Sequence, residues 1–134
     1  MVWIKAFFAG VLATLVFHQG LFAVLYGLGA VPVPPYNFSP VPPLGVPAVV
    51  SLAFFGGLWG LPAWAVMRRF AGKALWVTAL VFGAIAPTVV AMLVVFPLRD
   101  QAVDVQTWIG GLILNGAWGI GVAVFMRLMG ARRV

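Results

Sequence analysis

Residues 74–98 read ALWVTALVFGAIAPTVVAMLVVFPL and carry no charged side chain. A helix needs about 20 consecutive apolar residues to cross a hydrocarbon core roughly 30 Å thick, and this stretch is long enough. Three further stretches of the same character occupy residues 6–29, 47–67 and 107–129. We therefore expect an all-α integral membrane protein. Residues 1–134 should form one transmembrane domain, a four-transmembrane-helix bundle.

The composition favours lipid as the main solvent. Of the 134 residues, 64% are hydrophobic and 7% are charged, whereas a soluble domain carries about 25% charged residues. The chain has no cysteine, one histidine and two acidic residues, so it lacks the usual ligands of a protein-only metal site. We expect no metal and no other cofactor. The net charge of +6 is explained by topology and lipid headgroups, so nucleic acid is not an expected partner.

The basic residues predict the orientation of the bundle. Seven of the eight fall on one face: Lys5, Arg68, Arg69, Lys73, Arg127, Arg132 and Arg133. Arg99 alone falls on the other face, beside Asp100 and Asp104. Basic residues in short loops stay on the cytoplasmic side during insertion. Both termini are therefore predicted to be cytoplasmic.

The predicted outer loop, residues 31–47, has seven prolines and no charge. Proline fixes φ and lacks an N–H, so the loop cannot be helical and should be extended or polyproline-like. Its apolar side chains favour a loop packed over the outer end of the bundle or against a partner. A loop that lies in the headgroup region is the alternative.

The second and fourth stretches resemble each other. Gly57-Leu58-Trp59-Gly60 aligns with Gly116-Ala117-Trp118-Gly119, and Met67-Arg68 falls on Met126-Arg127. The first and third stretches match more faintly, with Lys5-Ala6 against Lys73-Ala74. This pattern is typical of two tandem hairpin repeats related by an axis along the membrane normal. Chance matches between apolar segments would give the same pattern.

Small residues recur at helical spacing in the same two stretches. They are Gly56, Gly57 and Gly60 in one, and Gly111, Gly116 and Gly119 in the other. Small residues let membrane helices approach closely, so these faces are predicted to be helix contacts. Trp59 and Trp118 are expected to fill gaps on a neighbouring helix. Ordinary packing explains these residues better than a cofactor site does.

A few polar residues lie inside the apolar stretches at similar predicted depth: His18, Gln19, Thr88 and Asn115. At 1.5 Å per residue, His18 and Gln19 lie about 14 Å from the outer end of their helix. Hydrocarbon offers no hydrogen-bond partners, so these groups must pair within the protein. We expect His18 to donate to Asn115, or to the carbonyl that Pro87 leaves free at Gly83. An ionisable residue at this depth is also a functional hypothesis.

Three segments carry a resemblance to known proteins: LVFHQG (15–20), YNFSPVPPLGVPAVVSLAFFGGLWG (36–60) and NGAWG (115–119). The chain resembles a family of small uncharacterised bacterial inner-membrane proteins. The resemblance implies four helices and a multi-pass protein in the bacterial inner (plasma) membrane. It implies no activity.

Two functional interpretations remain open. The first is a non-enzymatic accessory or assembly subunit that contacts the lipid bilayer and other membrane-protein subunits or further copies of itself. The second is a small transporter or channel with a polar site around His18 and Asn115. No catalytic residue is predicted, because no nucleophile, base and orienting group occur together. A dry, self-paired polar layer would favour the first interpretation, and a layer that opens to a cavity the second.

Overall fold

Four helices account for most of the chain. The structure, a computed structural model, describes residues 1–131, so Arg132 and Arg133 of the predicted basic group lie outside the described residues. The helices span Val2–Gly27, Ala48–Met67, Gly72–Leu98 and Val105–Leu128, and each is long and apolar enough to cross a membrane. The prediction of four such helices is confirmed. Their ends lie within about one helical turn of the expected ones.

The first and third of these helices each contain a π-helical turn. The first comprises α1 (Val2–Ala13), η1 (Thr14–His18) and α2 (Gln19–Gly27), and the third comprises α4 (Gly72–Val90), η2 (Ala91–Val95) and α5 (Phe96–Leu98). The second and fourth are α3 (Ala48–Met67) and α6 (Val105–Leu128). At the end of η1, the amide of Gln19 donates to the carbonyl of Thr14, five residues back. The sequence predicted continuous helices and did not predict these π-turns. A π-turn adds one residue to a helix without making the stretch less apolar, so the apolar pattern does not reveal it.

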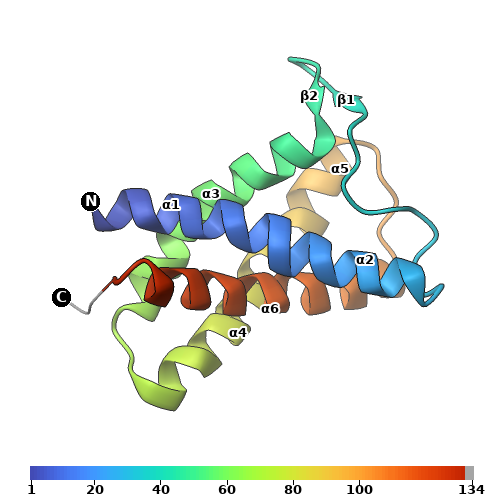
Figure 1. Cartoon of the computed structure of the whole chain (residues 1–134). Helices are drawn as coiled ribbons and strands as arrows, with labels where there is room; N and C mark the ends of the chain where they lie inside the picture. The colour runs from blue at the N-terminus through green and yellow to red at the C-terminus, as the bar shows by residue number, and fades with distance from the viewer. Residues whose placement is uncertain (132–134) are drawn as a thin grey trace.

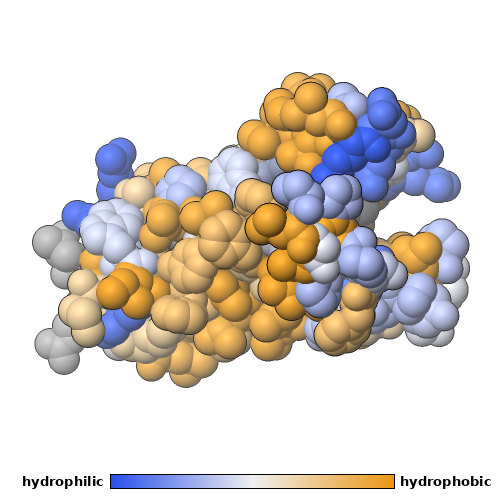
Figure 2. Space-filling view, turned by 90° about the horizontal axis from the view of Figure 1, so that it is seen from above, coloured by the Kyte–Doolittle hydropathy of each residue, from blue (hydrophilic) through white to orange (hydrophobic). Residues whose placement is uncertain are grey.

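α1 and α6 lie side by side in the middle of the bundle (Figure 1). α3 packs against α1 and α4 packs against α6, whereas α3 and α4 make few contacts with each other. The start of α1, the turn from α3 to α4 and the end of α6 lie together, and we call this the basic end. We call the opposite end, which carries β1 and β2, the hairpin end. Apolar residues cover the middle of the surface, and hydrophilic residues gather towards the two ends (Figure 2).

Mostly small side chains form the core. Its buried residues are Ala6, Ala9, Ala13, Ala63, Trp64, Met67, Ala79, Trp118, Val122, Ala123 and Met126. Small residues let the helix backbones come close, which increases the dispersion energy between helices that share an apolar surrounding.

Backbone contacts at glycines hold α3 against α1. A Cβ atom at Gly10 would collide with the carbonyl oxygen of Gly56, and a Cβ at Gly60 would collide with that of Ala6. Gly57 faces the ring of Phe7. A side chain at Gly10 or Gly60 would meet backbone and force the two helices apart.

α4 and α6 meet in the same manner. A Cβ at Gly83 would collide with the backbone carbonyl of Asn115, and a Cβ at Gly119 would collide with that of Ala79. The other two predicted glycines of α6 face side chains of the same neighbour. Gly116 faces Leu80 and Ala84, and Gly111 faces Met92 and Thr88.

The two helical hairpins, α1–α3 and α4–α6, therefore use corresponding residues. Gly60 over Ala6 corresponds to Gly119 over Ala79. The predicted match of Lys5-Ala6 with Lys73-Ala74 is in a different register, because the residue beneath Gly119 is Ala79 and not Ala74. The observed register aligns Trp3-x-x-Ala6-x-x-x-Gly10 with Trp76-x-x-Ala79-x-x-x-Gly83.

The correspondence continues at the basic end. The guanidinium of Arg68 lies over the ring of Trp3, and that of Arg127 lies over the ring of Trp76, each 5.5 Å from the ring centroid. Met67 and Met126, one residue before each arginine, are both fully buried. Cation–π pairs at exposed positions contribute about 0.5–1 kcal/mol each, so both hairpins are closed here by the same modest interaction.

The loop between α2 and α3 contains a small sheet. β1 (Pro40–Val41) pairs with β2 (Val46–Pro47) in antiparallel register. The amide of Gly45, which has φ +72°, donates to the carbonyl of Val41, and the Pro42–Pro43 peptide between the strands is cis. No helix forms over residues 28–47, in agreement with the prolines. The all-α prediction is incomplete, because these strands come from a proline-rich segment without the alternation of a typical strand.

A side-chain cap begins α6 at the hairpin end. The carboxylate of Asp104 accepts the hydroxyl of Thr107 at 2.7 Å and the amide of Thr107 at 2.8 Å. These two hydrogen bonds lower the pKa of the Asp104 carboxyl, and the one from the Thr107 hydroxyl has the larger effect. The cap satisfies an amide that would otherwise have no partner in the first turn.

Gly119→Ala is expected to destabilise the bundle, because the added Cβ would collide with the backbone of Ala79. Overpacking of this kind costs about 1–3 kcal/mol. Gly110→Ala, in the same helix, is the matched control: nothing lies within 4 Å of its Cβ position, and alanine favours helix over glycine by about 1 kcal/mol. Thermal unfolding in detergent compares the two variants. Equal melting temperatures would show that this contact does not hold α6 against α4.

Candidate functional site

The four polar residues predicted at similar depth form two separate hydrogen-bonded pairs. His18 pairs with Gln19 on the first helix, and Asn115 pairs with Thr88 between α6 and α4. Within residues 1–131, no side-chain hydrogen bond joins one pair to the other. Their similar predicted depth therefore does not bring them into one network.

Gln19 connects the first helix to the outer loop. Its Oε1 accepts the backbone amide of Tyr36 at 2.8 Å, and its Nε2 lies 3.1 Å from Nδ1 of His18. The Gln19 side chain is 7% exposed. Burial of a carboxamide is costly unless its polar atoms are hydrogen-bonded, and here the oxygen and the nitrogen each have a partner.

The π-turn offers Tyr36 a second partner. Because the Gln19 amide donates to Thr14, the carbonyl of Leu15 does not receive that amide, its usual α-helical donor. The Tyr36 hydroxyl donates to this carbonyl at 2.7 Å. Tyr36 is thus held through its backbone and through its side chain. These contacts compensate for its φ of +53°, a conformation that is uncommon outside glycine.

His18 does not make the predicted contact with another helix. Its Nδ1 pairs with Gln19, its neighbour in the chain, and not with Asn115 or with the carbonyl at Gly83. When Nδ1 accepts from Nε2 of Gln19, the carboxamide oxygen is directed to the Tyr36 amide. His18 therefore orients Gln19, and Gln19 contacts the loop.

The second pair strengthens the contact between α4 and α6. Nδ2 of Asn115 donates to Oγ1 of Thr88 at 2.9 Å, and Thr88 is fully buried. The corresponding place in the first hairpin holds Gly56, which faces the Thr14 side chain. The Thr14 hydroxyl donates to the carbonyl of Gly10 at 2.9 Å. Both pairs of helices thus have a threonine beside their glycine contact.

Trp59 and Trp118 each contact the other helical hairpin. The Trp118 indole donates to the carbonyl of Gly10 at 3.2 Å and is buried. Trp59 packs edge-on against Phe82 of α4, with ring centroids 6.4 Å apart, and is only half-buried. The interface of α6 with α1 is therefore more closed than that of α3 with α4.

Backbone hydrogen bonds fix the loop to the first turn of α3. The amide of Ala48 donates to the carbonyl of Ser39 at 2.9 Å, and the amide of Val49 donates to that of Asn37 at 2.8 Å. The Asn37 side chain in turn accepts the amide of Ser39 at 2.8 Å. Since Tyr36 is bound to Gln19, these contacts place Gln19 close to the start of α3.

The fixed loop leaves large apolar side chains uncovered. Phe38 is 71% exposed and Leu44, at the turn between β1 and β2, is 84% exposed. We call Phe38 together with residues 40–47, which include Leu44, the apolar hairpin. It is held by the protein at its base and faces outward at its tip.

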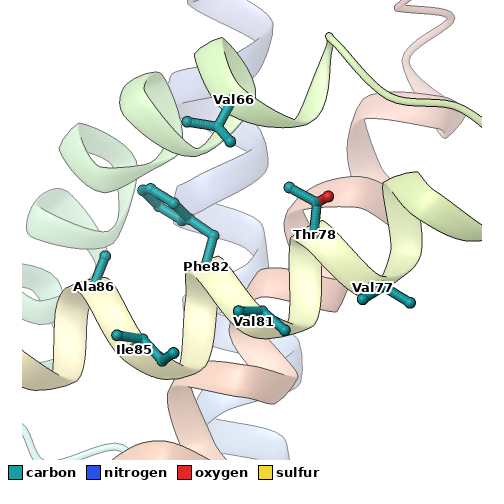
Figure 3. Close-up of a pocket in the computed structure, with 7 residues that line it drawn as sticks. All are labelled: Val66, Val77, Thr78, Val81, Phe82, Ile85 and Ala86. Carbon is teal, nitrogen blue, oxygen red and sulfur yellow. The ribbon is translucent and has the colours of Figure 1, made fainter.

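The buried polar groups of the bundle are paired within the protein. Every buried side-chain nitrogen and oxygen in residues 1–131 has a hydrogen-bond partner. Within the same residues, no three His, Cys, Asp or Glu side chains lie close enough to hold a metal ion. Two surface hollows lie away from both polar pairs: one between α3 and α4 (Figure 3), the other beside Trp3 and Arg68.

Comparison of the chain with protein-family models, curated proteins and solved structures gives no match. The resemblance to small bacterial inner-membrane proteins therefore stays a prediction. The site must be interpreted from its own geometry. Tyr36 is the residue that sequence reasoning missed, because nothing in the proline-rich segment indicates that the loop returns to Gln19.

Tyr36→Phe is expected to destabilise the protein by about 1 kcal/mol, because the Leu15 carbonyl loses its donor. The loop should also become more sensitive to protease. Tyr26→Phe is the matched control, since that tyrosine is exposed near the end of α2. Thermal unfolding and limited proteolysis measure the two effects. If both variants behave alike, the Tyr36 hydroxyl does not anchor the loop.

Proposed function

We propose that the protein is a non-enzymatic accessory or assembly subunit of a membrane complex, which acts through helix contacts and through its apolar hairpin. The apolar hairpin carries the proposal. Its base is hydrogen-bonded to Gln19 and to the first turn of α3, while Phe38 beside this base and Leu44 at the tip are uncovered. Exposed apolar surface that is held in one conformation is typical of protein interaction sites.

The polar pairs support a structural function for the bundle interior. Each of His18, Gln19, Thr88 and Asn115 has a partner within the bundle or its loop. The alternative, a transporter or channel around His18 and Asn115, has less support, because neither hollow is lined by these residues. The pairs also contain no nucleophile with an adjacent base, which supports a function without catalysis.

We further propose that the chain is inserted in the bacterial inner membrane with both termini cytoplasmic. Five of the six described basic residues lie at the basic end, in the first turn of α1, at the turn from α3 to α4 and near the end of α6: Lys5, Arg68, Arg69, Lys73 and Arg127. Arg99, just after α5, is the exception. Both acidic residues belong to the segment between α5 and α6, at the opposite end. This asymmetry supports a cytoplasmic basic end.

The corresponding contacts of α1–α3 and α4–α6 support the proposal that the chain consists of two tandem hairpin repeats. The same glycine-over-alanine contact and the same tryptophan–arginine pair occur in each hairpin. Chance resemblance between apolar segments does not predict matching three-dimensional contacts.

Co-purification tests the proposed function. Tagged protein purified from its native membrane in mild detergent should carry a second chain in stoichiometric amount. Leu44→Asp should reduce that chain by about tenfold or more, as substitution of a central apolar contact does. Leu28→Asp is the control, because Leu28 is 76% exposed just after α2 and outside the apolar hairpin. A wild-type protein without a stoichiometric partner, or equal loss in both variants, would contradict the proposal.

Single cysteines at Ser39 and Ala71 test the orientation. In intact cells a membrane-impermeant thiol reagent should label Ser39→Cys and not Ala71→Cys, because the chain has no other cysteine and Ala71 lies at the basic end. Permeabilised cells, in which both should react, provide the control. Labelling of Ala71→Cys alone in intact cells would reverse the topology.

A further inference from the structure

The groove between α3 and α4 lies where the corresponding interface of the other two helices is closed. Since α1–α3 corresponds to α4–α6, the contact of α3 with α4 corresponds to that of α6 with α1. The α1–α6 interface is extensive, whereas α3 and α4 diverge around a hollow of about 410 Å³ (Figure 3).

Two corresponding positions explain why the groove stays open. Phe17 and Phe125 pack edge-on across the α1–α6 interface, with centroids 5.9 Å apart. In the register of Gly60 with Gly119, Val66 takes the place of Phe125, and Val66 lines the groove. In the same register Pro62 takes the place of Gly121, whose missing Cβ lets α6 approach Phe17.

A third difference lies at the basic end. Lys5 closes the α1–α6 interface there, because its Nζ donates to the carbonyl of Met129 at 2.7 Å. In the register of Ala6 with Ala79, the residue in the place of Lys5 is Thr78, whose side chain is much shorter. Thr78 lines the groove.

The groove is apolar and about one leaflet long. α4 contributes two rows at helical spacing, Val77, Val81 and Ile85, and Thr78, Phe82 and Ala86, opposite Val66 of α3 (Figure 3). The eight steps from Val77 to Ile85 span about 12 Å of helix. Half of a hydrocarbon core roughly 30 Å thick is about 15 Å. A transmembrane helix of a second copy would need a groove of about twice this length.

A cation stands at the basic end of the same groove. Lys73 lies one turn before Val77 in its row and is exposed. Arg69, in the turn after α3, lines the other hollow with Trp3 and Arg68. The only acidic side chains, Asp100 and Asp104, belong to the segment at the hairpin end. The charge at the mouth of the groove is therefore complementary to an anionic group supplied from outside the chain.

We propose that the groove binds an acyl chain of an anionic phospholipid, whose phosphate pairs with Lys73. The proposal rests on the membrane insertion proposed above, but it is independent of a protein partner. The acyl chain fills the space that the Phe125 ring fills in the corresponding interface. The headgroup takes the place at the basic end that Lys5 closes between α1 and α6.

Thermal unfolding in a neutral detergent tests this proposal on the full chain. Phosphatidylglycerol should raise the melting temperature by roughly 5 °C at saturation. Phosphatidylcholine with the same acyl chains should raise it by much less. Glycerol phosphate, which has the anionic group without acyl chains, should have no effect.

Matched variants separate the headgroup from the chain. Lys73→Gln should lose the phosphatidylglycerol effect, whereas Arg99→Gln, at the hairpin end, should keep it. Val81→Trp should lose it by filling the groove, whereas Leu93→Trp, exposed on the same helix outside the groove, should keep it.

Several results would overturn the proposal. They are an equal rise with both lipids, a phosphatidylglycerol effect that survives Lys73→Gln, or a rise with glycerol phosphate alone, which would indicate a free-phosphate site. A dimer in native mass spectrometry that Val81→Trp dissociates would assign the groove to a second copy. If Lys73→Gln does not fold, native mass spectrometry of the wild type decides: retained anionic phospholipid supports the proposal, and its absence contradicts it.

Discussion

Contact between helix backbones at Gly10, Gly60, Gly83 and Gly119 holds the four helices together as two close pairs. Helices surrounded by apolar solvent gain little from burying apolar side chains against each other, so their association relies on close packing. Each glycine lets a carbonyl of the neighbouring helix come within contact of its own backbone. The result is two tight helical hairpins, and α1 and α6 are the helices through which the hairpins join.

The position of the outer loop follows from this packing. With α3 held against α1 at Gly56 and Gly60, the first turn of α3 lies near Gln19, while α2 continues to Gly27. The chain that leaves α2 must therefore return alongside it. Backbone groups that return in this way need hydrogen-bond partners. Gln19 supplies one for the backbone amide of Tyr36, and the carbonyl that the π-turn exposes at Leu15 accepts the hydroxyl of the same tyrosine. The helix irregularity and the shape of the loop are thus parts of one arrangement.

The number of helices and their approximate ends could be predicted from the length of the apolar stretches alone. The repeat that relates the second helix to the fourth could be predicted from the matching segments Gly57-Leu58-Trp59-Gly60 and Gly116-Ala117-Trp118-Gly119. The register of the first helices was also available, in the shared spacing of Trp3, Ala6 and Gly10 with Trp76, Ala79 and Gly83. The match of Lys5 with Lys73 gave a different register, because these two lysines make no corresponding contact.

Other features could not be predicted from the sequence. A π-turn has no sequence signature in an apolar helix, so the free carbonyl at Leu15 was invisible. The partner of His18 depends on how far each helix is rotated about its axis, and a change of about 100° per residue decides which neighbour a side chain meets. The strands β1 and β2 are two residues each and are held by their surroundings, so local β propensity gives little signal.

The apolar hairpin is preformed, because hydrogen bonds to Gln19 and α3 hold it even though its tip is exposed. Amide hydrogen exchange of the protein in lipid nanodiscs measures how firmly it is held. Slow exchange is expected at the hydrogen-bonded amides of Tyr36, Ser39, Gly45, Ala48 and Val49. If residues 36–49 exchange at the rates of an unstructured chain, the hairpin is not preformed.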